Sequence, residues 1–288
     1  MEEDIKEKIN QLVGDITDTL KKELSDYLES ITLIGSYAIG KISLERPNIN
    51  ILLFTKPNIN AETYLRIGEI FYKVSKKYED YFGVKIDSLP FKYGLPTSKK
   101  ELQVVLSPNF LSMIEKDQKP LFGVPHNVLE GMKATRKVIF GSDPLANVEP
   151  VYTKRDLYQW AIFDVGVIFR NLLLRTPISY DVEEHLDLLA HDSLELGKSA
   201  LYWGVEIFMD EEDIKKGNHI KLINDKNEMV NFFSKEDKEL GDATRIILEA
   251  RENFKEYKKS KDKASKLYNA SFIVVNKIFF KVLSEIKK

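Results

Sequence analysis

Two asparagines, Asn48 and Asn50, open the apolar segment NINILLF at positions 48–54. Alternate side chains of a β-strand point to the same face, so these two amides are expected roughly 6–7 Å apart along one face of a strand. Carboxylates at that spacing can share one or two magnesium ions, as metal-assisted transfer of phosphoryl groups requires. The two positions therefore have the spacing of a metal site, but they carry neutral amides in place of acids.

A glycine-serine pair, Gly35-Ser36, follows a short apolar segment, and Gly40 comes shortly after it. Glycine lets the backbone turn with an unusual φ and lets a ligand approach the chain closely. The free N–H groups at the start of a following short helix, together with the Ser36 hydroxyl, would then bind an anion. These residues predict a phosphate-binding turn next to the strand that carries the asparagines.

The elements that must position these residues alternate between helical and strand patterns. The expected order is helix 3–29, strand 31–34, a short helix, strand 50–54, helix 61–80 and strand 83–87. Two further strand patterns, 101–107 and 135–143, fall in a segment that several prolines interrupt. This order of elements indicates an α/β sheet.

The second half of the chain has a different character. Helical spacing of apolar residues dominates over 154–174, 181–208, 234–258 and 262–286. We place the boundary near Pro150, which gives a first domain of residues 1–150 and a helical bundle of residues 151–288. Segment 271–283 is apolar nearly all round, so its helix is expected at the centre of the bundle.

Charge is distributed unevenly in this half. Residues 181–213 hold eleven acidic side chains against one lysine, and residues 251–288 hold eleven basic side chains against four acids. We expect two helix faces that attract one another across the bundle. A docking surface is the alternative, and in that case the basic segment would contact nucleic acid phosphates.

Composition excludes several classes of site. The chain has no cysteine, so disulfides, zinc-thiolate sites and thiol nucleophiles are excluded. The net charge of −2 indicates no global attraction to nucleic acid or membrane. The acidic N-terminus lacks a signal-peptide pattern and no apolar run approaches the ~20 residues of a membrane span, so we expect a cytoplasmic protein. The abundance of Lys, Glu and Ile is typical of a thermophile.

The stretch around the glycines and asparagines resembles the DNA polymerase beta nucleotidyltransferase superfamily. The motif stands here as Gly35-Ser36 with Gly40, then Pro47-Asn48-Ile49-Asn50, and the best match to the third family carboxylate is Asp87. The resemblance covers about residues 20–88, while the helical half is similar in layout alone to the antibiotic-modifying members. It implies a nucleotidyltransferase-like α/β (α+β) domain with a small mixed sheet, an all-helical bundle domain, a magnesium cofactor and a nucleoside triphosphate as partner.

The departure from the family lies at the centre of the motif, because the family has Asp, or sometimes Glu, at positions 48 and 50. An amide oxygen brings no charge, and magnesium prefers carboxylate oxygens. With Asp87 as the one remaining acid, the local charge is about −1 instead of about −3, so metal affinity should collapse together with the Lewis-acid contribution to transfer. We expect a degenerate active site, with weak magnesium binding at Asp87 or none. An engineered exchange of the acids would leave the same pattern.

Other interpretations of the same residues stay open. An aspartate at a strand end, as Asp87 is, also caps turns. The tetrapeptide PNIN recurs at 57–60 in an expected loop, so an unrelated α/β domain would also account for the asparagines. If the resemblance holds, Asn48, Asn50 and Asp87 should lie on adjacent strands and converge on one cleft that the Gly35-Ser36 turn borders.

Three functions follow from this pattern. The first is a non-catalytic, nucleotide-binding or regulatory homologue of a nucleotidyltransferase. The second is an active enzyme that moves a nucleoside monophosphate to a small molecule, a protein or RNA, with the acceptor unspecified. The third is an interaction module that binds no nucleotide and acts through a protein partner or a homo-oligomer. Triphosphate binding without turnover favours the first, and nucleotide incorporation favours the second.

Overall fold

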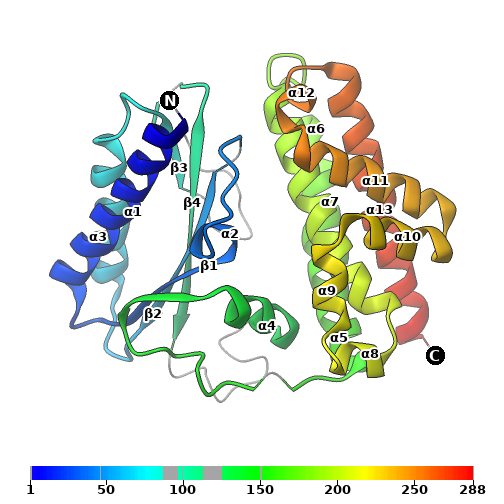
Figure 1. Cartoon of the computed structure of the whole chain (residues 1–288), viewed down its shortest axis with the longest axis horizontal. Coiled ribbons are helices and arrows are strands. Elements are labelled where there is room, and N and C mark those ends of the chain that lie inside the picture. The colour runs from blue at the N-terminus through cyan, green and yellow to red at the C-terminus, as the bar shows by residue number, and fades with distance from the viewer. Residues whose placement is uncertain are drawn as a thin grey trace. The chain divides into compact units, whose positions relative to one another are not determined.

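The computed structural model of the chain describes residues 2–45, 47–86, 97–98, 100–112, 125–149 and 151–287. The chain divides into two units, Met1–Val151 and Tyr152–Lys288, which are called unit 1 and unit 2 below (Figure 1). Unit 1 consists of α1 (Glu2–Leu24), β1 (Leu28–Ile34), α2 (Gly35–Ala38), β2 (Asn48–Thr55), α3 (Ala61–Lys76), β3 (Gly83–Ile86), β4 (Gln103–Ser112), α4 (His126–Thr135) and β5 (Lys137–Gly141).

The five strands form one mixed sheet with the order β3-β4-β2-β1-β5. β1 runs antiparallel to both β2 and β5, whereas β4 runs parallel to both β2 and β3. The first helix ends at Leu24, earlier than its apolar spacing predicts, because the Tyr27 N–H donates to the Leu24 carbonyl and turns the chain into β1. The helix α4 has no counterpart among the expected elements.

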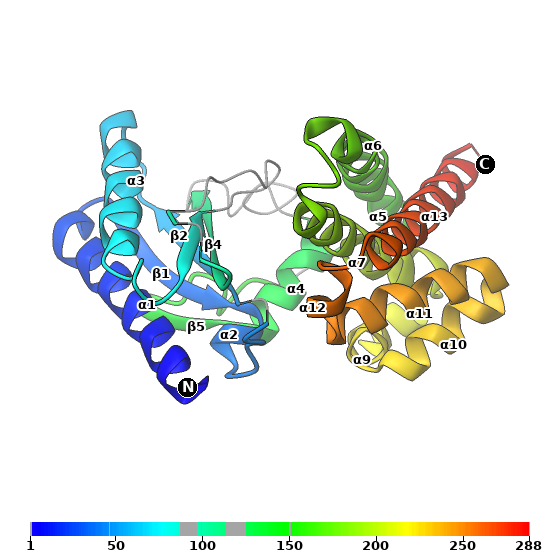
Figure 2. The same cartoon turned by 90° about the horizontal axis from the view of Figure 1, so that it is seen from above.

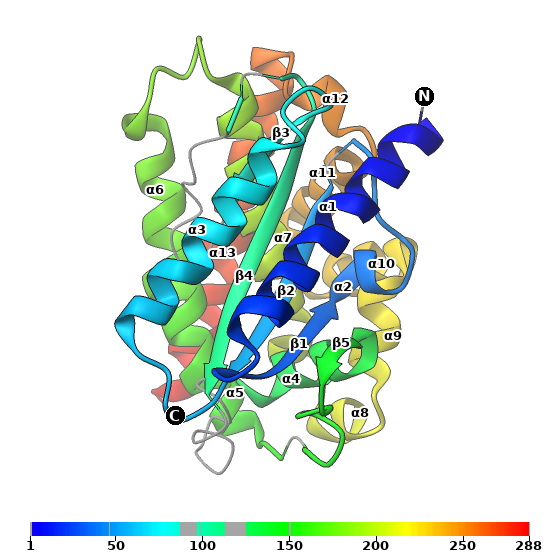
Figure 3. The same ribbon diagram turned by 90° about the vertical axis from the view of Figure 1, so that its left-hand side faces the viewer.

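One face of the sheet is closed by α1 and α3, which lie side by side along it (Figures 2 and 3). Ile49, Ile51 and Leu53 of β2 point into this layer and are fully buried, and Leu12 and Phe71 meet them from the two helices. The three isoleucine and leucine positions alternate in β2, as a strand with one closed face requires.

The opposite face is closed over part of its length. Leu52 and Phe54 of β2 pack there with Leu111, Leu129 and Leu145. The same face of β2 carries Asn48 and Asn50 at its other end, where both side chains are partly exposed. β2 is therefore apolar toward α1 and α3 from Ile49 to Leu53, and half apolar and half polar on its other side.

Unit 2 is helical. It consists of α5 (Lys154–Ala161), the π-helix η3 (Ile162–Phe169), α6 (Arg170–Ser179), α7 (Leu186–Phe208), α8 (Glu211–Lys215), α9 (Asn218–Asn224), α10 (Lys226–Glu236), α11 (Lys238–Glu252), α12 (Phe254–Tyr257) and α13 (Lys261–Ile286). The predicted fold class, a small mixed sheet followed by a helical bundle, is confirmed. The helical pattern 234–258 is interrupted, because the Asp237 carboxylate accepts the Leu240 N–H and begins a new helix at α11.

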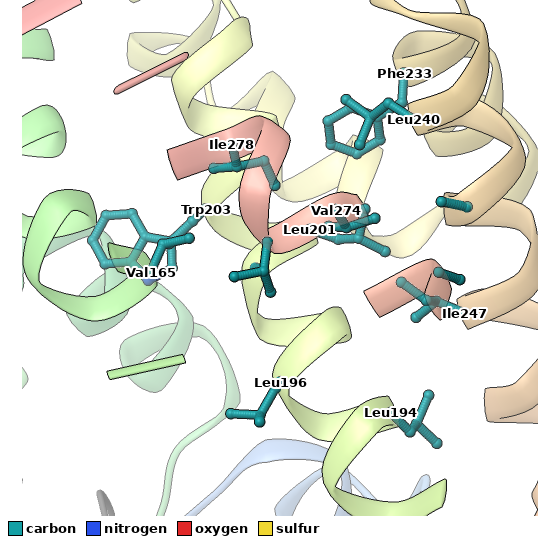
Figure 4. Packing of buried hydrophobic residues seen from close by; sticks show 14 of the residues in the cluster. Val165, Leu194, Leu196, Leu201, Trp203, Phe233, Leu240, Ile247, Val274 and Ile278 are labelled. Carbon is teal, nitrogen blue, oxygen red and sulfur yellow. The ribbon is translucent and has the colours of Figure 1, made fainter. Parts of the chain in front are cut away.

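α7 and α13 pack against each other at the centre of unit 2 (Figure 4). Leu201 and Trp203 of α7 and Val274 and Ile278 of α13 are buried in this core. Gly204 gives room for Ile278, since a Cβ at Gly204 would lie 2.7 Å from the Ile278 Cδ1 atom. The central place expected for segment 271–283 is confirmed.

An ion pair between Lys261 and Glu183 joins the two oppositely charged segments of unit 2. Lys277 of the basic segment instead bridges Asp237 and Glu239 at the start of α11. The attraction across the bundle is thus distributed over more helices than the composition predicts.

Two stretches of unit 2, Lys154–Ser179 and Lys261–Ile286, are long and apolar enough to cross a membrane by length and composition alone. Core helices of soluble proteins meet the same criterion. Both stretches contribute side chains to the buried core of unit 2, among them Val165 and Val274.

Candidate functional site

The polar end of β2 brings the two asparagines next to β4. In the parallel pairing, Asn48 is level with Val105, and Asn50 is level with Ser107. The Ser107 hydroxyl donates to the Asn48 side-chain oxygen over 3.3 Å. Ser107 therefore lies on the same face as the asparagines. The sequence predicted a strand that ends at Ser107, but it did not show that this strand pairs with β2 and so brings Ser107 to the asparagines.

The turn after β1 lies on the other side of Asn50. Ile34, the last residue of β1, is level with Asn50, and Gly35 follows with φ +77°. A Cβ at Gly35 would lie 3.2 Å from the Asn50 Nδ2 atom. Glycine is thus required twice at this position, for the left-handed backbone and for the close approach of the Asn50 amide. Gly40 also has a positive φ, of +74°.

The backbone donor at Gly35 is bound within the protein. Its N–H donates to the Thr135 hydroxyl over 3.0 Å, and that hydroxyl donates in turn to the Gly131 carbonyl over 2.8 Å. α4 is thereby joined to the turn. The expectation that the turn offers its backbone N–H groups to an anion needs correction at Gly35, while the exposed Ser36 hydroxyl lies next to it.

The strand that leads to Asp87 is not a neighbour of β2. β4 lies between β3 and β2, so β3, the strand that precedes Asp87 in the chain, is not adjacent to the strand of the asparagines. The physical reason is that β4 pairs in parallel with both strands and takes the place beside β2. Asp87 itself lies outside the described residues, and its role stays a prediction.

A lysine that no sequence pattern singled out shares the face of the asparagines. Lys85 of β3 is level with Val105 of β4, which is in turn level with Asn48 of β2. Val84 and Val104 point to the opposite face and are fully buried under α1 and α3. By the alternation of strand side chains, Lys85 points to the side of Asn48. Two strand spacings, roughly 10 Å, separate the two backbones.

These side chains do not fit a magnesium pair. Around Asn48 and Asn50 the described residues offer amides, the Ser107 and Ser36 hydroxyls and the Lys85 ammonium group, while magnesium prefers carboxylate oxygens. Across the described ranges, three or more His, Asp or Glu side chains nowhere form a group that could hold a metal ion. What the face offers is hydrogen-bond donors.

Unit 2 holds two ionisable side chains that burial perturbs. Burial raises the pKa of Asp164 to about 6, although a hydrogen bond with the Trp203 side chain partly counteracts the rise. Burial lowers the pKa of Lys154 to about 8. Lys154 donates to the Glu206 and Ile207 carbonyls at the end of α7, so it caps that helix. Neither residue was predicted to matter from the sequence.

No protein-family model matches the chain, and no curated protein matches its sequence. Among solved structures, the chain is similar to the spectinomycin adenyltransferase AAD(9) from Enterococcus faecialis, whose crystal structure contains ATP and spectinomycin. The TM-score is 0.52 at 11% sequence identity, over 95% of this chain and 98% of that chain. At this identity the likeness shows the fold, which is that of a nucleotidyltransferase.

Proposed function

We propose that this chain is a non-catalytic member of the nucleotidyltransferase fold, which binds a nucleoside triphosphate on the face of Asn48 and Asn50 without transferring the nucleotide. The fold supports the triphosphate, since the similar adenyltransferase was crystallised with ATP. The observation that carries the proposal is the pair of neutral amides on the polar end of β2, with a serine on the neighbouring strand.

Charge explains why transfer should be absent. Metal-assisted transfer needs an ion that polarises the phosphoryl oxygens and is held by anionic ligands. Asn48, Asn50 and Ser107 carry no charge, so they cannot hold a divalent ion against its own hydration. Binding makes fewer demands, because hydrogen-bond donors alone can bind phosphate oxygens.

The test is a turnover assay with labelled ATP, CTP, GTP and UTP in the presence of magnesium. We expect neither incorporation of label into protein, RNA or small acceptors nor release of pyrophosphate above the protein-free background. Calorimetric titration should at the same time show binding of at least one triphosphate. Magnesium-dependent turnover that Asn50→Ala abolishes would establish an active enzyme, and absence of binding for all four would indicate an interaction module.

The paired exchange Asn48→Asp with Asn50→Asp supplies the positive control. Restored carboxylates should give triphosphate binding that depends on magnesium, because two charges return to the positions where the ion would lie. If the paired exchange leaves binding unchanged both with and without magnesium, these positions do not form the ligand site.

A further inference from the structure

We infer that this face binds the phosphate chain of a nucleoside triphosphate directly, through side-chain donors and without a bridging metal ion. The inference rests on the proposed function and adds the way in which the ligand is bound. The inference follows from the hydrogen-bond donors that the described side chains bring to this face. A carboxylate site would bind a triphosphate only with magnesium, whereas this face is expected to bind it without magnesium.

The amides are the first donors. Each asparagine carries two N–H donors and one acceptor oxygen. The oxygen of Asn48 already accepts the Ser107 hydroxyl, so the side chain of Asn48 has its NH₂ group left to donate. The NH₂ group of Asn50 lies against Gly35, and the exposed Ser36 follows Gly35 in the chain. The amide donor of Asn50 therefore lies at the turn that carries Ser36.

Lys85 is the cationic contribution. It lies on the same face as Asn48, two strands away, and it carries a positive charge. A phosphate oxygen bound by an amide and an ammonium group gains a charge-assisted hydrogen bond. In a carboxylate site the same oxygen would be repelled unless a metal ion stood between the two anions.

The experiment is calorimetric titration of ATP into the full chain, once in excess EDTA and once in excess magnesium, at low ionic strength. Binding in EDTA should be at least as tight as binding in magnesium, and the two dissociation constants should differ by no more than about threefold. The reason is that the ion is not part of the site and only neutralises charge on the ligand. Asn50→Asp should weaken binding in EDTA by about tenfold or more, since a donor is replaced by an anion. Lys85→Gln should weaken it several-fold.

The repeated tetrapeptide supplies a matched control. Asn58 lies in the exposed loop copy of PNIN at 57–60, so Asn58→Asp adds the same charge in the same local sequence away from this face. It should leave ATP binding unchanged. Asn48→Asp provides a second variant of the face, and circular dichroism of each variant establishes that it is folded.

The outcomes separate the two proposals. ATP binding that requires magnesium would overturn this inference and leave the proposed function standing. Binding in EDTA that Asn50→Asp and Asn48→Asp both leave unchanged would also overturn it. No binding of ATP, CTP, GTP or UTP in either condition would overturn the proposed function itself. Metal-free binding that both asparagine exchanges weaken and Asn58→Asp does not would support the inference.

Discussion

Asn50 in unit 1 and Asp164 in unit 2 are side chains of nearly the same shape, and each is partly shielded from water. Asn50 lies against the glycine turn and carries no charge. Asp164 lies in the π-helix η3 with a hydrogen bond to the Trp203 side chain, and burial raises its pKa to about 6. An acid at such a place keeps its proton to higher pH unless a cation pairs with it.

The neutral amide at position 50 affects whether the site of unit 1 needs a metal ion. By the family resemblance, a carboxylate at position 50 would be one of several acids that need a metal ion between them. The amide has no such need, so the face can exist without metal. Asp164 in unit 2 shows the other outcome, in which burial of a carboxylate raises its pKa.

The largest expected effect concerns the closed face of β2, opposite to Asn50. Ile51→Ala removes a fully buried side chain from the layer between the sheet, α1 and α3. The lost burial and the cavity left behind should lower the free energy of unfolding by about 2–5 kcal/mol. Asn48→Ala, on the partly exposed face of the same strand, should cost less than about 1 kcal/mol. Urea unfolding of both variants measures the difference, and equal losses would show that the two faces do not differ as described.

The turn beside Asn50 comes next in size. Gly35→Ala forces a left-handed backbone on alanine and brings its Cβ to 3.2 Å from the Asn50 Nδ2 atom. We expect a loss of about 2 kcal/mol in the free energy of unfolding, of which the backbone accounts for roughly 1–2 kcal/mol. Urea unfolding measures this loss as well.

Gly40→Ala is the matched control for the turn. Gly40 has nearly the same φ, but nothing lies within 4 Å of the position that a Cβ would take there. It should therefore show the backbone cost alone. A Gly35→Ala variant that is as stable as Gly40→Ala and binds ATP equally well would argue that Asn50 is not crowded by the turn.

The smallest expected effect concerns Asp164 in unit 2. The pKa of Asp164 in the folded protein, about 6, lies above the ordinary value of 3.8. Its contribution to stability is therefore fully present below about pH 4 and is lost as the pH rises through about 6. Asp164→Asn should remove this loss and raise the free energy of unfolding at pH 7 by about 1–2 kcal/mol, after allowance for partial exposure to solvent.

Thermal unfolding of Asp164→Asn and of the unaltered protein at about pH 4 and at pH 7 checks this prediction. At about pH 4, where the aspartic acid carries little charge, the variant and the unaltered protein should be nearly equal in stability. A stability gap that is the same at both pH values would show that Asp164 does not titrate in the range that its burial indicates.

The sequence by itself determined the patterns of most helices and strands, though not of α4, and the residue types on the polar end of β2. Strand alternation placed Ile49 and Ile51 in the core and Asn48 and Asn50 on the opposite face, and helical spacing predicted the bundle. These are properties of local periodicity, which the chain carries without reference to its partners. That Asn48 and Asn50 carry no charge likewise follows from the sequence alone.

The tertiary structure alone decided which segments lie beside the asparagines. Ser107, Thr135 and Lys85 come to the site because β4 pairs with both β2 and β3 and because α4 packs beside the glycine turn. Strand order is set by long-range hydrogen bonding between segments that are far apart in the chain, and local periodicity holds no information about it. For the same reason, the sequence could not show that β4, and not β3, takes the place beside β2.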